Sequence, residues 1–167
     1  MSAAPAGAVD TLDQFAVVAG LPEQMADALA ALDGGVAGLP EHHEIDNVVV
    51  LGMGGSGISG DVLTAVASPL CPVPIVVSKD YELPGFVGAR TLVLAVSCSG
   101  STEEVLEAAT EAAHGGARLV AVCQGGALAE RAGEWGAPHI TVAPDLLMPR
   151  SAIGALSVFV GLLTQPA

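Results

Sequence analysis

Two short segments of the sequence combine glycines and hydroxyl side chains in a way that suits the binding of a phosphate group. The first, residues 52–57, reads Gly-Met-Gly-Gly-Ser-Gly and directly follows an apolar run. Glycines at such a turn let backbone N–H groups surround an anion, and Ser56 adds a hydroxyl donor. The second, residues 97–102, carries four hydroxyls in six residues, more than the capping of a helix requires. Together they predict a nest of amides and hydroxyls around one phosphate.

The glycine spacing of the first segment is also compatible with a different ligand. Gly52, Gly54 and Gly57 match the G-x-G-x-x-G pattern of dinucleotide-binding folds. Asp80 lies near the distance expected for the acidic residue that binds the ribose. A tight strand-to-helix turn without a ligand is a third interpretation. The hydroxyls of the second segment favour the phosphate site, because a dinucleotide site requires only one glycine loop and an acid.

Both segments follow apolar runs that are typical of buried parallel strands, because the runs lack alternation and are rich in Val, Ile and Leu. The predicted strands cover residues 47–52, 73–78, 91–97, 118–123 and 139–143. The predicted helices cover residues 12–32, 59–67, 102–114, 127–135 and 150–163. This alternation predicts an α/β fold, a three-layer αβα sandwich with a five-stranded parallel sheet in flavodoxin-like order.

The placement of the two segments follows from that strand order. The first and third strands are neighbours in it, so both segments would face one crevice at the carboxyl ends of the strands. We expect residues 1–46 to form an N-terminal helix and a polar link that pack on a domain formed by residues 47–167. The closing helix is apolar nearly all round, and we expect it to lie uncovered in this chain. A mean hydropathy of +0.61 also predicts apolar surface that another subunit covers.

The composition restricts the partners of the chain. Five Lys and Arg residues against 18 Asp and Glu residues give a formal net charge of -13, so we expect no nucleic acid partner. We expect no membrane partner either, because the longest apolar stretch, residues 152–163, is too short to span a bilayer. The three cysteines, Cys71, Cys98 and Cys123, form no C-x-x-C pair and indicate reduced thiols in a cytoplasmic protein without a metal or cofactor. The alternation of its strand predicts that Cys98 is a packed thiol.

Around these residues the sequence resembles the SIS (sugar isomerase) domain, and most closely the bifunctional phosphoglucose/phosphomannose isomerase family. The matching stretches occur in the family's order and are Gly52 to Asp61 (GMGGSGISGD), Tyr81 to Pro84 (the YxLP pattern), Ser97 to Thr102 (SCSGST) and Met148 to Gly154 (MPRSAIG). Two positions depart from the commoner SYSGNT form of the second loop. Cys98 replaces an aromatic residue and Ser101 replaces Asn, which changes the shape of the pocket but keeps the phosphate hydroxyls.

The resemblance implies a role for particular residues. The substrate phosphate would be bound by Ser56, Ser97, Ser99 and Thr102. Gly54 and Gly55 would contact the sugar, and Arg150 would stabilise the charge on an enediolate. The implied reaction is the aldose–ketose interconversion of hexose 6-phosphates, glucose 6-phosphate or mannose 6-phosphate with fructose 6-phosphate, through an enediol.

Members of this family carry a second SIS domain, which supplies a catalytic Glu and a His and Lys for ring opening. The resemblance therefore implies that this chain is an incomplete half, inactive alone, whose ligand is a hexose 6-phosphate. Its expected partner is a second copy of the chain or a second SIS half that covers the closing helix. Two other functions stay open, a non-catalytic sugar-phosphate sensor and, less favoured, an NAD-dependent oxidoreductase.

Overall fold

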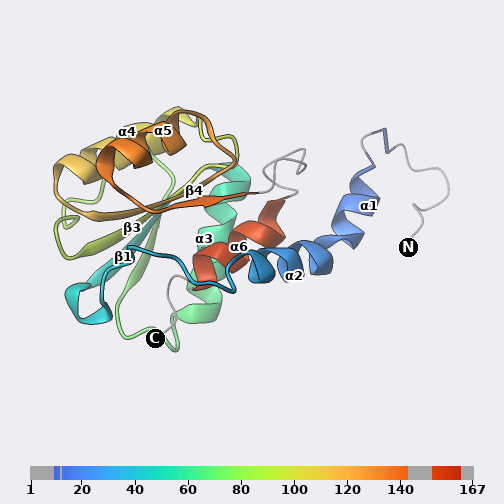
Figure 1. Cartoon of the computed structure of the whole chain (residues 1–167), viewed down its shortest axis with the longest axis horizontal. Coiled ribbons are helices and arrows are strands. Elements are labelled where there is room, and N and C mark those ends of the chain that lie inside the picture. The colour runs from blue at the N-terminus through green and yellow to red at the C-terminus, as the bar shows by residue number, and fades with distance from the viewer. Residues whose placement is uncertain (1–9, 12, 143–151, 163–167) are drawn as a thin grey trace.

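A five-stranded parallel sheet forms the centre of the computed structural model, which describes residues 10–11, 13–142 and 152–162 (Figure 1). The strands are β1 (Asn47–Leu51), β2 (Ile75–Ser78), β3 (Thr91–Val96), β4 (Arg118–Cys123) and β5 (His139–Thr141). Their order is β2-β1-β3-β4-β5 and every pair is parallel. The predicted fold class, strand direction and flavodoxin-like order are thus confirmed.

The strands are apolar throughout because both faces of the sheet are buried. Val48 and Val50 belong to the core on one face, whereas Val49 and Leu51 belong to the core on the other. All four side chains are at most 3% exposed. Successive side chains of a strand point to opposite faces, so a strand without polar alternation requires a cover on each side.

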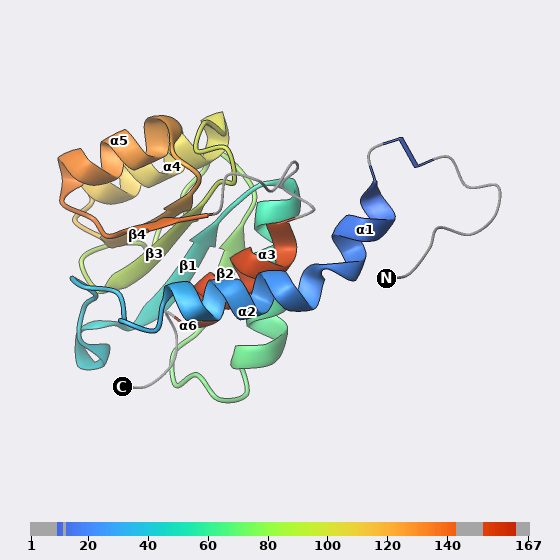
Figure 2. The same cartoon turned by 45° about the vertical axis from the view of Figure 1, so that its right-hand side comes forward.

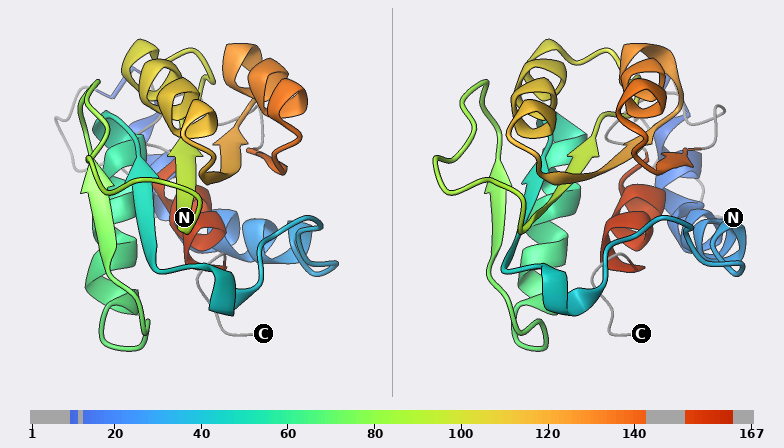
Figure 3. Two further views of the ribbon diagram at one scale, coloured as in Figure 1. Left: turned by 90° about the vertical axis from the view of Figure 1, so that its left-hand side faces the viewer. Right: turned by 60° about the vertical axis from the view of Figure 1, so that its left-hand side comes forward.

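Helices supply that cover in two layers (Figure 3). On one face lie α4 (Glu103–His114) and α5 (Gly126–Trp135), whose buried sides are largely alanine. On the other face lie α3 (Gly54–Ala67) and α6 (Ile153–Leu162), and α2 (Leu21–Ala31) packs on α6. No helix among the described residues has both the length and the apolar character needed to cross a bilayer.

The predicted helix over residues 12–32 is wrong in one respect, because the structure has two helices there. The first, α1 (Gln14–Ala19), ends before Gly20, and α2 begins at Leu21. Pro22 lies in the first turn of α2, where its missing N–H is tolerated, but it cannot continue a preceding helix. Helix α1 extends away from the body of the domain, and none of its six residues is buried (Figure 2).

The expectation that the closing helix lies uncovered is also wrong. Helix α6 packs against α2 and α3, and Leu156 is fully buried between them and the sheet. A Cβ atom on Gly154 would lie 3.2 Å from the Leu21 side chain and 3.3 Å from that of Met25, so α6 and α2 approach closely. The exposed apolar side chains lie elsewhere, mainly on α1, α2 and α3: Phe15, Val18, Met25, Leu29, Ile58, Val62 and Val66.

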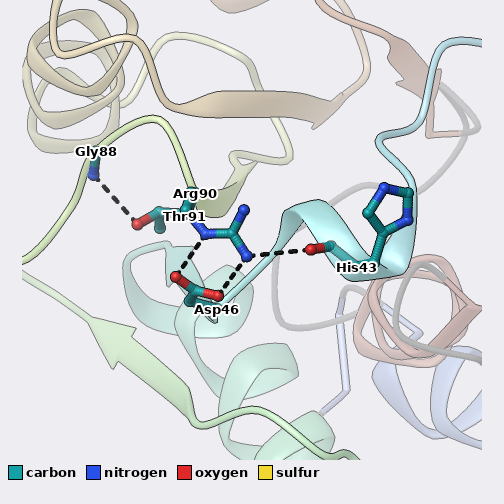
Figure 4. A network of polar contacts seen from close by, with 5 residues as sticks. All are labelled: His43, Asp46, Gly88, Arg90 and Thr91. Carbon is teal, nitrogen blue, oxygen red and sulfur yellow. Dashed lines mark hydrogen bonds and ion pairs between the residues drawn. The ribbon is translucent and has the colours of Figure 1, made fainter.

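An arginine network ties the polar link to the sheet at the amino end of its strands (Figure 4). Arg90, just before β3, donates two hydrogen bonds of 2.7 Å to the carboxylate of Asp46, just before β1. It donates a third, of 3.0 Å, to the carbonyl of His43 in the short 3-10 helix η1 (His42–Glu44). This end of the sheet is opposite to the one from which the glycine and serine segments emerge.

Candidate phosphate-binding site

The two predicted phosphate-binding segments leave the sheet at the same edge from neighbouring strands. β1 and β3 pair in parallel with Leu51 opposite Ala95. Each strand is therefore followed, at the same height, by one of the segments: residues 52–57 after β1 and residues 97–102 after β3. We call these the glycine turn and the serine loop.

The glycine turn is tighter than the sequence suggests, since α3 begins at Gly54 and the predicted start at Ser59 is five residues late. Gly54 has a φ of +51°, which favours glycine. A Cβ on Gly52 would lie 3.0 Å from the backbone N of Gly57, so no side chain fits between strand and helix. The N-cap residue, Met53, makes no side-chain cap bond. The amides of Gly54, Gly55 and Ser56 thus form the first turn of a helix, where N–H groups point out of its end.

The serine loop is organised by its own hydroxyls. The Ser97 and Thr102 hydroxyls hydrogen-bond to each other at 2.8 Å, and the Gly100 N–H donates to the Ser97 hydroxyl at 3.1 Å. The Ser101 N–H donates to the Ser99 hydroxyl at 3.3 Å. Ser97 is buried, Thr102 half-buried and Ser99 exposed. Thr102 is the N-cap of α4 without capping it by its side chain, so its hydroxyl lies in the loop rather than over the helix end.

One hydrogen bond joins the two segments. The N–H of Cys98 donates to the Ser56 hydroxyl at 3.3 Å, and both residues are less than 5% exposed. Because a hydroxyl that accepts one bond can still donate its proton, Ser56 keeps a donor for a ligand at this junction. Each of the hydroxyls of Ser56, Ser97, Ser99 and Thr102 is therefore hydrogen-bonded to a group of the serine loop, beside the first turn of α3 that holds Gly54 and Gly55.

A third segment, which sequence reasoning missed, also belongs to this edge. The turn after β4 contains Gly125 and Gly126, and the N–H groups of Gln124 and Leu128 donate to carbonyls of the serine loop. A signal for it existed, because a glycine pair directly after a strand indicates a tight strand-to-helix turn. The edge is thus built from three successive strand-to-helix connections of neighbouring strands.

Known proteins with similar sequences show the family of this chain. A bifunctional phosphoglucose/phosphomannose isomerase of Caldicellulosiruptor bescii is 40% identical over 140 residues, which is 84% of this chain and 41% of that protein. The protein of the same name from Thermoplasma acidophilum is 44% identical over 112 residues, 67% of this chain and 34% of that protein. The chain belongs to the bifunctional phosphoglucose/phosphomannose isomerase family. No protein-family model matches it.

Solved structures show the same fold at low sequence identity. The C-terminal domain of glucosamine-fructose-6-phosphate aminotransferase from Francisella tularensis superposes with a TM-score of 0.66 at 15% identity, over 90% of this chain and 47% of that chain. The Vibrio vulnificus NanR protein complexed with ManNAc-6P gives a TM-score of 0.65 at 18% identity, over 90% of this chain and 60% of that chain. At these identities the likeness is one of fold, and it agrees with the SIS domain expected from the sequence.

This member of the isomerase family spans less than half the length of the curated relatives that it matches. Arg150, the residue expected to stabilise an enediolate, lies outside the described residues. The structure therefore brings together the predicted phosphate ligands and the predicted sugar-contacting glycines, while the role of Arg150 stays a prediction.

The alternative dinucleotide site agrees less well with the architecture of this isomerase-family domain. The sheet order β2-β1-β3-β4-β5 places β3 beside β1, whereas the dinucleotide-binding order has strand 4 in that place. Asp80 follows β2 as a ribose ligand would, but its carboxylate accepts the N–H of the next residue, Tyr81, at 2.7 Å. The serine loop, beside the glycine turn, accounts for this edge of the sheet better.

The charges near the site do not attract an anion from a distance. Lys79 packs its side chain against Gly57, but its ammonium group pairs with Asp61 at 2.5 Å. The pKa of Tyr81 is raised, first by desolvation and then by the negative charges of nearby acidic residues, of which Glu103 in the first turn of α4 has the largest effect. An anionic ligand must consequently be held by short-range donors, the amides and hydroxyls of the two segments.

The thiol of the serine loop is not part of that donor set. Cys98 is 4% exposed and lies in the apolar core on the α3 and α6 side of the sheet. Burial raises the pKa of the Cys98 thiol, which disfavours a nucleophilic thiolate. Its interpretation as a packed thiol is confirmed, and only its backbone N–H takes part in the junction.

Proposed function

We propose that this domain binds the phosphate group of a hexose 6-phosphate between the glycine turn and the serine loop. The observation that supports this most directly is the hydrogen bond from the Cys98 N–H to the Ser56 hydroxyl, because it brings the donors of both segments to one place. Helix N-termini and hydroxyls are the donors that proteins use for phosphate when no free cation is at hand.

Within this proposal the two segments supply different donors to the phosphate. The exposed Ser99 hydroxyl and the half-buried Thr102 hydroxyl reach the phosphate oxygens from the serine loop before α4, while Ser56 and the amides of Gly54 and Gly55 reach them from α3. The buried Ser97 hydroxyl shares a hydrogen bond with Thr102, which orients the Thr102 hydroxyl toward the ligand. Gly54 and Gly55, which lack side chains, leave room for the sugar next to the phosphate.

We further propose that the bound sugar phosphate undergoes aldose–ketose isomerisation through an enediol, with glucose 6-phosphate or mannose 6-phosphate converting to fructose 6-phosphate. A base must remove the proton alpha to the carbonyl, and Arg150 is proposed to stabilise the developing oxyanion. Since the chain matches less than half of its relatives' length, we assign the base to the unmatched part, a second SIS half. The free thiols of Cys71, Cys98 and Cys123 fit the reducing cytoplasm that we propose as its location.

Calorimetry on the 167-residue chain tests the binding step. We expect fructose 6-phosphate to bind more tightly than fructose, and Ser99→Ala or Thr102→Val to weaken binding by about 10- to 150-fold, the equivalent of a hydrogen bond to a charged group worth about 1.5–3 kcal/mol. Ser101→Ala is the matched control, because it removes a hydroxyl of the same loop that lies against Gly126. Equal affinity for fructose and its phosphate would disprove phosphate recognition at this edge.

Turnover is tested separately. We expect a protein that joins this chain to the remaining length of a relative to convert fructose 6-phosphate to glucose 6-phosphate. Tight binding without turnover in that protein would instead favour a non-catalytic sugar-phosphate sensor, which would use the same phosphate site. A change in NADH fluorescence on addition of the chain would favour the oxidoreductase.

A further inference from the structure

The turn after β4 presses against the back of the serine loop through glycines on both sides. Gly100 and Gly126 have φ angles of +69° and +71°, a backbone region that favours glycine. A Cβ on Gly100 would overlap the carbonyl oxygen of Gly125. A Cβ on Gly126 would lie 2.9 Å from the Ser99 carbonyl oxygen and 2.9 Å from the Ser101 hydroxyl. The two connections can therefore touch only where both lack side chains.

Backbone hydrogen bonds fix this contact. The Gln124 N–H donates to the Cys98 carbonyl at 2.9 Å, and the Leu128 N–H donates to the Gly100 carbonyl at 2.9 Å. These bonds flank the glycine pair, so the turn holds the serine loop at two points two residues apart.

The carbonyls that the turn captures determine where the next amides point. In a trans peptide the C=O and the following N–H lie in one plane and point in opposite directions. The Cys98 carbonyl and the Ser99 N–H share one such plane, and the Gly100 carbonyl and the Ser101 N–H share another. Because both carbonyls face the β4 turn, the N–H groups of Ser99 and Ser101 face away from it. The Ser101 N–H donates to the Ser99 hydroxyl at 3.3 Å, so its direction also sets the position of that hydroxyl.

We propose that the Gly125–Gly126 turn is a positioning element of the phosphate site, which holds the backbone of Ser99 to Ser101 in the orientation that binds phosphate oxygens. This role rests on the proposed phosphate binding and extends it to a connection that contributes no side chain to the ligand. The turn acts by shape and by two backbone bonds, so a single added methyl group disturbs it.

A pair of matched variants tests the role. Gly126→Ala places a methyl group against the serine loop, whereas Gly136→Ala, at a φ of +65° after α5, places one in open space with nothing within 4 Å. Both variants put alanine in the same unfavourable backbone region, and Gly126→Ala adds the contact with the serine loop, so we expect it to lower Tm more than Gly136→Ala does. We expect Gly126→Ala to raise the Kd for fructose 6-phosphate roughly tenfold or more, and Gly136→Ala to leave it within about twofold. Equal Kd values in the two variants would overturn the positioning role while leaving phosphate binding intact.

Two further measurements keep the test decisive. NMR of the Ser99 and Ser101 amides should show shifts in Gly126→Ala and none in Gly136→Ala, whether or not the chain binds a sugar phosphate; unchanged shifts would overturn the role. If the wild-type chain fails to bind fructose 6-phosphate, the proposed function fails for this chain. The NMR shifts then still show whether the β4 turn positions the Ser99 and Ser101 amides. If Gly126→Ala does not fold, hydrogen exchange of the wild-type chain provides the test. Saturating fructose 6-phosphate should slow exchange at the Gln124 and Leu128 amides, and unchanged exchange would count against a coupling between the β4 turn and the phosphate site.

Discussion

Removal of the Ser56 hydroxyl should separate the glycine turn from the serine loop. In Ser56→Ala the Cys98 N–H loses its acceptor in a site where both residues are less than 5% exposed. A buried donor left without a partner costs about 1–3 kcal/mol, and the 3.3 Å length of this bond places the expected loss at about 1 kcal/mol. For a domain of this size that corresponds to a fall in Tm of about 2–4 °C.

A neighbouring serine provides the control. Ser59 is fully buried one turn along α3, and its hydroxyl donates to the Ser56 carbonyl at 2.6 Å. Ser59→Ala leaves that carbonyl in the ordinary hydrogen-bonding position of a helix, so no buried donor is orphaned. We expect a loss of less than about 1 kcal/mol from Ser59→Ala, and an unchanged Kd for fructose 6-phosphate.

Urea unfolding and calorimetry on the two variants measure both consequences. Ser56→Ala should lower the free energy of unfolding more than Ser59→Ala does, and it alone should weaken the binding of fructose 6-phosphate. If Ser59→Ala proves the more destabilising change, or if Ser56→Ala alters neither stability nor affinity, the two segments are not joined through this hydroxyl.

Three other outcomes follow from the structure. Arg90 lowers the pKa of Asp46, so the pair stabilises the fold above the ordinary Asp pKa and loses that effect as the pH falls through the lowered value. Arg90→Gln should therefore lower Tm more near pH 7 than in strong acid, where only the bond to the His43 carbonyl is lost, and a pH-independent loss would contradict the pairing. Because Cys98 is buried with a raised pKa, it should react with a thiol reagent far more slowly than the part-exposed Cys71, and equal rates would mean that the loop opens readily. Leu156→Ala should cost about 2–5 kcal/mol in urea unfolding, and a change below about 1 kcal/mol would show that α6 does not complete the core.

The parts of the fold that the sequence predicts well are those whose signal is local. β1 is recognisable because three consecutive valines, each buried, match the pattern of a strand covered on both faces. The predicted start of the helix over 59–67 is late because glycine is a poor helix former, and five of the residues at 52–60 are glycine. The structure shows that these glycines serve packing: a Cβ on Gly60 would lie 3.0 Å from Val50 and 3.1 Å from Val77.

Features that depend on contacts between distant segments were not predictable in the same way. The hydroxyls of Ser97, Ser99 and Thr102 stand out in the sequence, but the junction of Cys98 with Ser56 spans 42 residues and follows only from the strand order. High hydropathy indicated that some apolar surface needs a cover, without indicating which. Helix α6 turned out to be covered by α2, and the exposed apolar side chains lie on α1, α2 and α3 instead.

The packing of α6 against α2 and α3 also governs when a newly made chain can finish folding. One face of the sheet is closed by side chains from as early as Ala28 and as late as Val158. While the ribosome is still making α6, the apolar side chains on that face of β1, β3 and β4 have no complete cover and are open to chaperones or to other nascent chains. Substitutions in α6 should thus reduce the yield of folded protein in the cell, even where the purified survivor is only modestly destabilised.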